Sequence, residues 1–230
     1  MINFKLNLKP DTAKIQLKLI EMFTGIIKAK GKISKINKSK NQTTIEVETG
    51  KNFKLGKIGS SIAVNGICLT VTKIEKNKTR KNILHFDVMA ETLSKTNLKN
   101  LNGNLDENIE VNLEPALTFG QKLDGHFVQG HIDATGKILE IKKGKSQTKL
   151  KISYPKAFKK FLILKGSIAV NGVSLTISNL GKDNFEVCLV KHTLENTNLS
   201  NLKKNSKVNL EFDLLSKYLN SFNADKKHKK

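Results

Sequence analysis

The sequence of 230 residues contains no tryptophan, two tyrosines and a single arginine, Arg80. These residue types supply most of the stacking surfaces and bidentate phosphate contacts of nucleic-acid-binding proteins. The formal net charge of +21 nevertheless suggests, taken alone, a nucleic-acid partner. The lysines that produce this charge are spread through every segment, which is typical of a solvated surface. We therefore expect no nucleic-acid partner.

Long apolar runs are also missing, so no segment is expected to span a membrane. The two cysteines, Cys68 and Cys188, have no metal-like spacing. We expect no metal site at His126 and His131, because an offset of five residues in a strand places two side chains on opposite faces. The N-terminal residues carry scattered lysines and no apolar region like that of a signal peptide. These absences predict a cytoplasmic protein with reduced thiols and no metal.

The feature that stands out among what is present is an internal repeat. "GSSIAVNGICLTVT" begins at Gly59 and returns as "GSIAVNGVSLTIS" at Gly166. "ETLSKTNLKNL" returns as "HTLENTNLSNL", "EVNLEPAL" as "KVNLEFDLL" and, more weakly, "FTGIIKAKGKISKI" as "VQGHIDATGKILEI". Matched blocks in the same order indicate a tandem duplication. We predict an N-terminal extension, two related domains, and a C-terminal helix with a basic tail, over residues 1–21, 22–121, 122–209 and 210–230.

Each copy has the pattern of a β domain. Apolar residues alternate in "SIAVNG" and "CLTVT", and the Asn-Gly pairs at Asn65 and Asn171 can take the positive φ angles of a tight hairpin. Further short apolar runs predict more strands, so we expect an all-β sandwich or barrel. We also expect helical turns capped by Thr92 and Thr193. Helical spacing occurs only near the C-terminus, which predicts an amphipathic α-helix with Leu214, Leu215, Tyr218, Leu219 and Phe222 on its apolar face.

Five motifs together carry a family resemblance. They are "MFTGII" from Met22, "NGICLTVT", "ETLSKTNL", "GHFVQGHIDATG" and "NGVSLTIS". With these motifs in this order, residues 22–218 resemble the riboflavin synthase family, whose chains carry two tandem lumazine-binding repeats. The resemblance implies two tandem six-stranded Greek-key β-barrels, a C-terminal α-helix, and a homotrimer formed through those helices.

The resemblance also implies a reaction. Two molecules of 6,7-dimethyl-8-ribityllumazine react with each other, one donating a four-carbon unit, and yield riboflavin and 5-amino-6-ribitylaminouracil. Two related pockets that face each other, one from each of two neighbouring subunits, would hold the identical reactants, and orientation alone can lower such a barrier by about 7–11 kcal/mol. The resemblance implies no metal and no organic cofactor. Association with a lumazine synthase stays open.

Both copies contain positions that the resemblance implies for substrate binding. In "CLT" and "SLT" the first and third side chains share one strand face, so each pair of polar groups can meet a flat heteroaromatic ring. In the N-terminal barrel the implied residues are Thr24, Gly25, Ile26, Ile27, Ser61, Cys68, Leu69, Thr70, Asp87, Val88, Met89, Ala90, Glu91 and Thr92. In the C-terminal barrel they are Gly130, His131, Ile132, Lys165, Ser174, Leu175, Thr176, Cys188, Leu189, Val190, Lys191, His192, Thr193 and Asp213.

Four residues are expected at the reaction itself: His131, Cys68, Ser174 and Phe23. His131 aligns with an isoleucine of the first copy, so its imidazole has no match there, and a histidine can exchange protons near neutral pH. Cys68 is expected either to attack carbon 7 of the acceptor or to hydrogen-bond to it. We favour binding, because no neighbouring residue in the sequence would activate the thiol. Lys165 offers a cation to the ribityl chain or the pyrimidine oxygens.

The sequence departs from the family pattern at two places, and it also allows a competing interpretation. The family's chains begin at the equivalent of Met22, so we expect residues 1–21 to follow from a misassigned start. Asn171 occupies a place where some members have an acid, which removes one proton carrier. The competing interpretation is a non-catalytic lumazine- or flavin-binding antenna protein. Both copies keep their polar pair, and Phe23 and His131 are present, which favours the enzyme.

Overall fold

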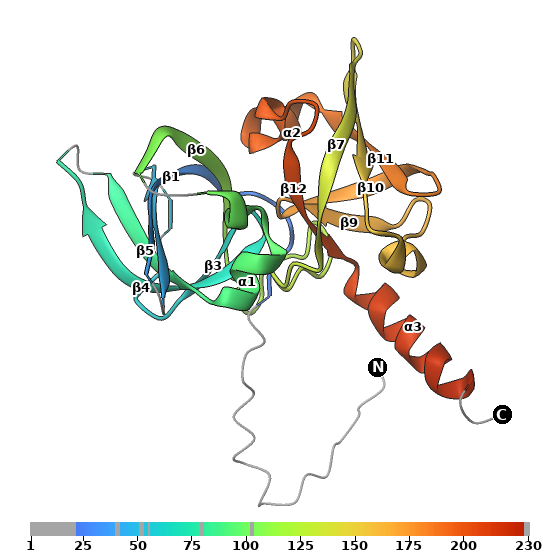
Figure 1. The fold of residues 1–230 in the computed structure, drawn as a ribbon, viewed down its shortest axis with the longest axis horizontal. Coiled ribbons are helices and arrows are strands. Elements are labelled where there is room, and N and C mark those ends of the chain that lie inside the picture. The colour runs from blue at the N-terminus through green and yellow to red at the C-terminus, as the bar shows by residue number, and fades with distance from the viewer. Residues whose placement is uncertain are drawn as a thin grey trace, which may run out of the picture.

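The computed structural model describes residues 22–39, 42–50, 53–54, 56–78, 81–101 and 104–227. It contains two closed six-stranded antiparallel barrels that lie side by side, with one α-helix at the C-terminal end (Figure 1). The N-terminal barrel consists of β1 (Ala29–Lys38), β2 (Thr43–Thr49), β3 (Ser61–Val64), β4 (Ile67–Lys76), β5 (Asn82–Val88) and β6 (Asn104–Pro115). The C-terminal barrel consists of β7 (Ala134–Lys143), β8 (Gln147–Ser153), β9 (Ser167–Val170), β10 (Val173–Leu180), β11 (Asn184–Val190) and β12 (Lys207–Phe212).

The two barrels share one topology. The strand order is β1-β2-β5-β4-β3-β6 in the first barrel. Read around the closed second barrel, the order is β7-β8-β11-β10-β9-β12, which is the same arrangement. In both, the second strand pairs with the fifth instead of the third, which is the Greek-key connection. This confirms the predicted all-β fold of two tandem barrels. The expected domain boundary at 209 falls inside β12.

Apolar alternation explains why these residues form barrels. Along β2 every second side chain is buried, and Ile45 and Val47 have no exposed surface. The matching strand β8 buries Leu150 and Ile152 in the same way. Each barrel encloses its own cluster of buried side chains, as expected when one face of a closed sheet points inward. Burial of these clusters is the main stabilising contribution to each barrel.

The two Asn-Gly turns meet between the barrels. Asn65 and Gly66 have φ angles of 49° and 77°, and Asn171 and Gly172 have 45° and 78°, so both predicted hairpin turns are confirmed. A Cβ atom on Gly66 would lie 2.7 Å from the backbone nitrogen of Gly172, and one on Gly172 would lie 2.6 Å from that of Gly66. The repeated glycine is therefore required twice, by the turn and by the close approach of its counterpart.

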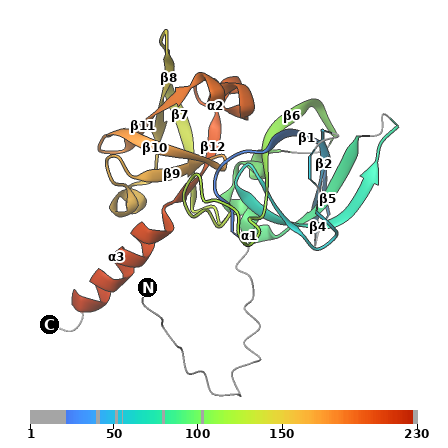
Figure 2. The same ribbon diagram turned by 180° about the vertical axis from the view of Figure 1, so that it is seen from behind.

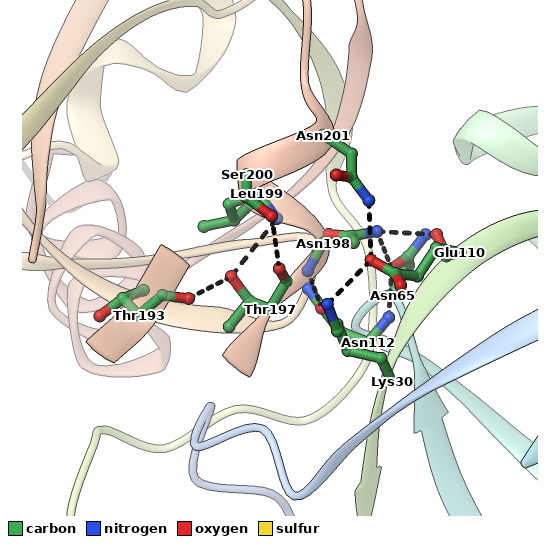
Figure 3. A network of polar contacts seen from close by, with 10 residues as sticks. All are labelled: Lys30, Asn65, Glu110, Asn112, Thr193, Thr197, Asn198, Leu199, Ser200 and Asn201. Carbon is green, nitrogen blue, oxygen red and sulfur yellow. Dashed lines mark hydrogen bonds and ion pairs between the residues drawn. The ribbon is translucent and has the colours of Figure 1, made fainter. Parts of the chain in front are cut away.

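Buried asparagines join the barrels around these turns. Asn112 Nδ2 donates to the Asn171 carbonyl at 2.9 Å, and Asn209 Nδ2 donates to the Asn65 carbonyl at 3.0 Å. Asn198 donates from its backbone nitrogen to Asn112 Oδ1 and from Nδ2 to Asn65 Oδ1. Figure 3 shows Asn65, Asn112 and Asn198 gathered at this contact. The asparagine side chains satisfy backbone groups of the opposite barrel, which fixes how the barrels dock.

The short helices correct one expectation. The remaining elements are α1 (Ala90–Lys95), η2 (Asn97–Asn100), η3 (Lys156–Phe161), α2 (Lys191–Asn196), η4 (Asn198–Asn201) and α3 (Leu214–Lys227). Thr92 and Thr193 lie inside α1 and α2, whose N-caps are Met89 and Val190, so their predicted capping role is wrong. The chain enters each helix directly from the preceding strand, which places the start earlier than the threonine. The predicted C-terminal helix is α3, which projects away from both barrels (Figure 2).

Candidate functional site

The segments that precede the two barrels pair with each other. Phe23 and Val128 form an antiparallel bridge, with the Phe23 nitrogen donating to the Val128 carbonyl at 2.7 Å and the Val128 nitrogen donating back at 3.1 Å. Phe23 has no exposed surface, and it packs with Val128, Ala63 and Ala169 from both barrels. The aromatic ring therefore lies in the contact between barrels. Gly25 and Gly130 each lie two residues after the bridge.

Each glycine segment contacts the opposite barrel. The Ser174 nitrogen of β10 donates to the Gly25 carbonyl at 2.8 Å, and the Cys68 nitrogen of β4 donates to the Gly130 carbonyl at 2.9 Å. Ile27 packs against the core of the C-terminal barrel, and Ile132 packs against that of the N-terminal barrel. The structure thus corrects the grouping of these residues by barrel. Gly25 belongs with Ser174 and Gly130 with Cys68, because the paired segments cross between the barrels.

A histidine lies beside Ser174. Nδ1 of His126 is 2.7 Å from Ser174 Oγ, and the His126 side chain is almost fully buried. Burial lowers the pKa of His126 below its ordinary 6.5, while the charge of Asp213 acts in the opposite direction. Within the described part of the chain, the buried Nε2 atom has no hydrogen-bond partner. An uncharged imidazole next to a hydroxyl can take up a proton from it.

The sequence pattern assigns no catalytic role to His126 and predicts no metal site that it would form with His131. The motif "GHFVQGHIDATG" contained the signal, because His126 lies four residues before Gly130 and the equivalent position before Gly25 is a glutamate. That glutamate, Glu21, lies outside the described residues. The contact with Ser174 required the fold, since β10 follows much later in the chain.

The Cys68 side of the site is more open. Cys68 is half-buried on β4, with Leu69 turned into the barrel and Thr70 exposed. β10 repeats this arrangement, with Ser174 half-buried, Leu175 turned inward and Thr176 exposed. The polar pairs therefore face outward on both barrels, and the members of each pair share one strand face, as the strand periodicity predicted. His131 follows Gly130 and is exposed.

From here, the Cys68 group means Cys68, Thr70, Gly130 and His131. The Ser174 group means Ser174, Thr176, Gly25 and His126.

Most of the remaining predicted residues lie near the ends of β5 and β11 and in the helices that follow them. Five of them, at the start of α1 and α2, are exposed: Met89, Ala90, Glu91, Lys191 and His192. Asp87, Thr92, Cys188, Val190 and Thr193 are exposed or half-buried, whereas Val88 and Leu189 turn into the barrels. Lys165 is exposed with a φ angle of 67°, and Asp213 Oδ1 accepts from the Leu215 nitrogen at 2.9 Å at the start of α3. Ile26 is half-buried.

A cavity of about 920 Å³ lies beside β3 and β6. Its lining includes Thr24, Ser61 and Glu114 but neither Cys68 nor Ser174. Ser61 pairs with Thr70 across β3 and β4 and is buried. The cavity therefore adjoins the outward face of the N-terminal barrel without including the Cys68 group.

The described residues contain no group of three or more His, Cys, Asp or Glu side chains that could hold a metal ion. Within the same ranges, no helix is long and apolar enough to cross a membrane.

The chain matches known proteins over most of its length. The lumazine binding domain family matches twice, at residues 24–116 and 129–213. Riboflavin synthase of Actinobacillus pleuropneumoniae is 40% identical over 201 residues, which cover 87% of this chain and 89% of that protein. Riboflavin synthase of Bacillus subtilis (strain 168) is 39% identical with the same coverage. The crystal structure of LumP complexed with 6,7-dimethyl-8-(1'-D-ribityl) lumazine is 26% identical with a TM-score of 0.71, covering 83% of this chain and 99% of LumP. The chain belongs to the riboflavin synthase family, with one lumazine-binding domain in each barrel.

Proposed function

We propose that the protein is a riboflavin synthase, a transferase that converts two molecules of 6,7-dimethyl-8-ribityllumazine into riboflavin and 5-amino-6-ribitylaminouracil. The observation that carries this proposal is the repeated site. Each barrel presents an outward polar pair, Cys68 with Thr70 or Ser174 with Thr176, against a glycine segment of the opposite copy. Two related surfaces suit a reaction between two identical molecules.

The chemistry needs proton transfer and orientation. The atoms of two lumazine molecules equal those of the two products, so the transfer of the four-carbon unit consumes no oxidant or reductant. Removal of a proton from the exocyclic methyl group of the donor requires a base, and His126 is suited to accept that proton through the Ser174 hydroxyl. His131 stays a second candidate, on the Cys68 group. Orientation of the two rings supplies the remaining lowering of the barrier.

Cys68 and Ser174 distinguish the two bound molecules in this proposal. They occupy equivalent positions, and each backbone nitrogen donates to a glycine carbonyl of the crossing segment. Only Ser174 has a buried imidazole at its side chain among the described residues. We therefore place the donor molecule at the Ser174 group and the acceptor at the Cys68 group, with Cys68 binding the acceptor through its thiol.

The exposed face of α3 supports a homotrimer. Leu215, Tyr218, Leu219 and Phe222 are each more than half exposed, although they form one apolar stripe. A trimer would cover this stripe and would bring the Cys68 group of one subunit to the Ser174 group of its neighbour. Replacing Leu219 and Phe222 by lysine is expected to give monomers with little activity, as measured by light scattering and turnover. Ser221→Lys on the same helix is the control.

A reducing cytoplasm is the proposed location, because Cys68 and Cys188 form no disulfide. Association with a lumazine synthase is left open by the sequence, and co-purification of the two proteins would test it. Neither point affects the chemistry.

The test of the function uses purified protein and the dimethyl-ribityllumazine alone. Appearance of riboflavin absorbance, with the uracil product in equal amount, supports the proposal. Lumazine binding without riboflavin formation supports the second candidate, an antenna-like binding protein, which the likeness to ligand-bound LumP favours. Absence of both contradicts the two candidates together.

A further inference from the structure

Two buried glutamates hold the glycine segments in place. Glu114, on β6, is 3% exposed, and its Oε1 accepts from the Thr24 nitrogen and the Thr24 hydroxyl, both at 2.7 Å. Its Oε2 accepts from the Gly25 nitrogen at 2.9 Å. Both carboxylate oxygens are thus engaged by the segment that reaches the opposite barrel.

Glu211 repeats this arrangement on β12. It is 2% exposed, its Oε1 accepts from the Gln129 nitrogen at 2.7 Å, and its Oε2 accepts from the Gly130 nitrogen at 2.9 Å. Charge-assisted hydrogen bonds of this kind are among the strongest and most directional in proteins. Burying a carboxylate is costly unless its oxygens accept hydrogen bonds. The buried position of each glutamate therefore depends on the two amides that donate to it.

The backbone that each glutamate binds also contacts the Cys68 group or the Ser174 group. Gly130 uses its nitrogen to donate to Glu211 and its carbonyl to accept from the Cys68 nitrogen. Gly25 does the same between Glu114 and Ser174. Both glycines have positive φ angles, of 79° and 75°. A Cβ on Gly130 would lie 2.5 Å from that of Cys68, and one on Gly25 would lie 2.7 Å from that of Ser174.

We propose that Glu211 and Glu114 are positioning residues that act across the barrels: Glu211 through Gly130 on the Cys68 group, and Glu114 through Gly25 on the Ser174 group. The part of this inference that concerns lumazine rests on the proposed function. The two glutamates are matched in sequence position, in burial and in accepting from two successive backbone amides, and they differ in which group they reach. Each therefore serves as the control for the other.

Burying the two carboxylates costs free energy, which supports a positioning role for them. Burial raises the pKa of Glu114, and it raises the pKa of Glu211 to about 7 against the opposing effects of the two amides and of Lys217. The charged groups that face Glu211 are Lys217 of α3 and Asp133, which form an ion pair with 2.6 Å between Nζ and Oδ2. A hydrophobic residue at either glutamate would avoid this cost but would leave two amides without acceptors.

The first experiment is hydrogen exchange on the full chain. Glutamine keeps one acceptor oxygen and places an NH₂ group against the other amide, so Glu211→Gln should speed exchange of the Cys68 amide about tenfold and leave the Ser174 amide unchanged. Glu114→Gln should do the reverse. Equal acceleration of both amides in either variant, or no change in either, overturns the proposal.

Should Glu211→Gln fail to fold, the wild-type protein gives the same test. Protonation of Glu211 removes one acceptor, so protection of the Cys68 amide, relative to the Asn171 amide, should fall as the pH decreases through about 7. Constant relative protection across that range overturns the role of Glu211.

The second experiment measures the affinity for lumazine at the Cys68 group and at the Ser174 group separately. Alkylation of Cys68 and Cys188 by N-ethylmaleimide is followed by peptide mass mapping, with dimethyl-ribityllumazine as the protecting ligand. Cys188 reports on the Ser174 side, because β11 pairs with β10. Glu211→Gln should raise the lumazine concentration that protects Cys68 about fivefold with little change at Cys188, and Glu114→Gln the opposite. Turnover should fall in both variants, because both molecules must be bound.

The outcomes separate this inference from the proposed function. If lumazine protects neither cysteine of the wild-type protein, the proposed function fails, and hydrogen exchange still decides the role of the glutamates. If lumazine protects the wild type but each glutamine variant weakens protection of both cysteines equally, the proposed function stands and the crossed positioning is overturned.

Discussion

Nδ1 of His126 lies 2.7 Å from Oγ of Ser174, a residue 48 positions later in the chain. The contact joins the segment between the barrels to the strand that carries the polar pair of the C-terminal barrel. Because burial lowers the pKa of His126, the imidazole is uncharged at neutral pH. It is therefore in the protonation state that a proton acceptor needs.

Replacing His126 by alanine should lower turnover about 10²–10⁴-fold, the usual contribution of a positioned acid or base. Ser174→Ala should cost a similar factor, and the double variant should be little worse than either, because the two side chains act as one unit. Turnover is measured by riboflavin absorbance at saturating lumazine. His85→Ala is the control, since His85 contacts Glu75 on the N-terminal barrel.

Additive losses in the double variant would show that His126 and Ser174 act separately. A loss confined to lumazine binding would contradict proton transfer by His126.

Gly66→Ala and Gly172→Ala should each destabilise the fold by more than about 2 kcal/mol. Each alanine would combine a positive φ angle with a contact of 2.7 Å or less to the backbone of the other turn. Urea unfolding measures the change. Gly50→Ala is the matched control, because a Cβ there meets nothing within 4 Å, and its effect should stay within about 0.5 kcal/mol. Equal effects at all three glycines would contradict the close turn contact.

Glu211 should make stability fall as the pH rises. Its pKa is about 7 in the folded protein against 4.5 for an ordinary glutamate, so the folded state binds more protons between these values. Its contribution is therefore fully present below about pH 4.5 and is lost as the pH rises through about 7, by about 3 kcal/mol. Urea unfolding at about pH 5 and pH 8, at one protein concentration, should show a smaller difference for Glu211→Gln than for the wild type.

The exposed Glu91 of α1 supplies the control for that measurement. Glu91→Gln should leave the pH dependence close to that of the wild type. An unchanged difference in Glu211→Gln would mean that Glu211 does not titrate in this range.

Asn112→Ala should lower the free energy of unfolding by about 2–4 kcal/mol, because it leaves the Asn171 carbonyl and the Asn198 amide buried without their partner. Asn201→Ala removes an exposed side chain that donates to Glu110, and should cost less than about 0.5 kcal/mol. Chemical denaturation compares the two variants. Similar losses would indicate that the buried network does not join the barrels.

Local patterns predicted much of the fold. The turn at Asn65-Gly66, the shared strand face of Cys68 and Thr70, and the apolar stripe of α3 all follow from periods of two or 3.6 residues and from the φ angles that Asn-Gly allows. The capping prediction at Thr92 and Thr193 was wrong because the start of α1 and α2 is set by the strand that leads into each helix.

The sequence by itself determined the duplication, the two barrels, the final helix and the family, because repeats, alternation and motifs are recorded within short stretches of chain. Only the tertiary structure decided that Gly25 meets Ser174, that Gly130 meets Cys68, and that His126 and the two buried glutamates belong with them. These contacts depend on how one barrel docks against the other, and side-chain periodicity describes which face a residue occupies but not which distant backbone will cover it.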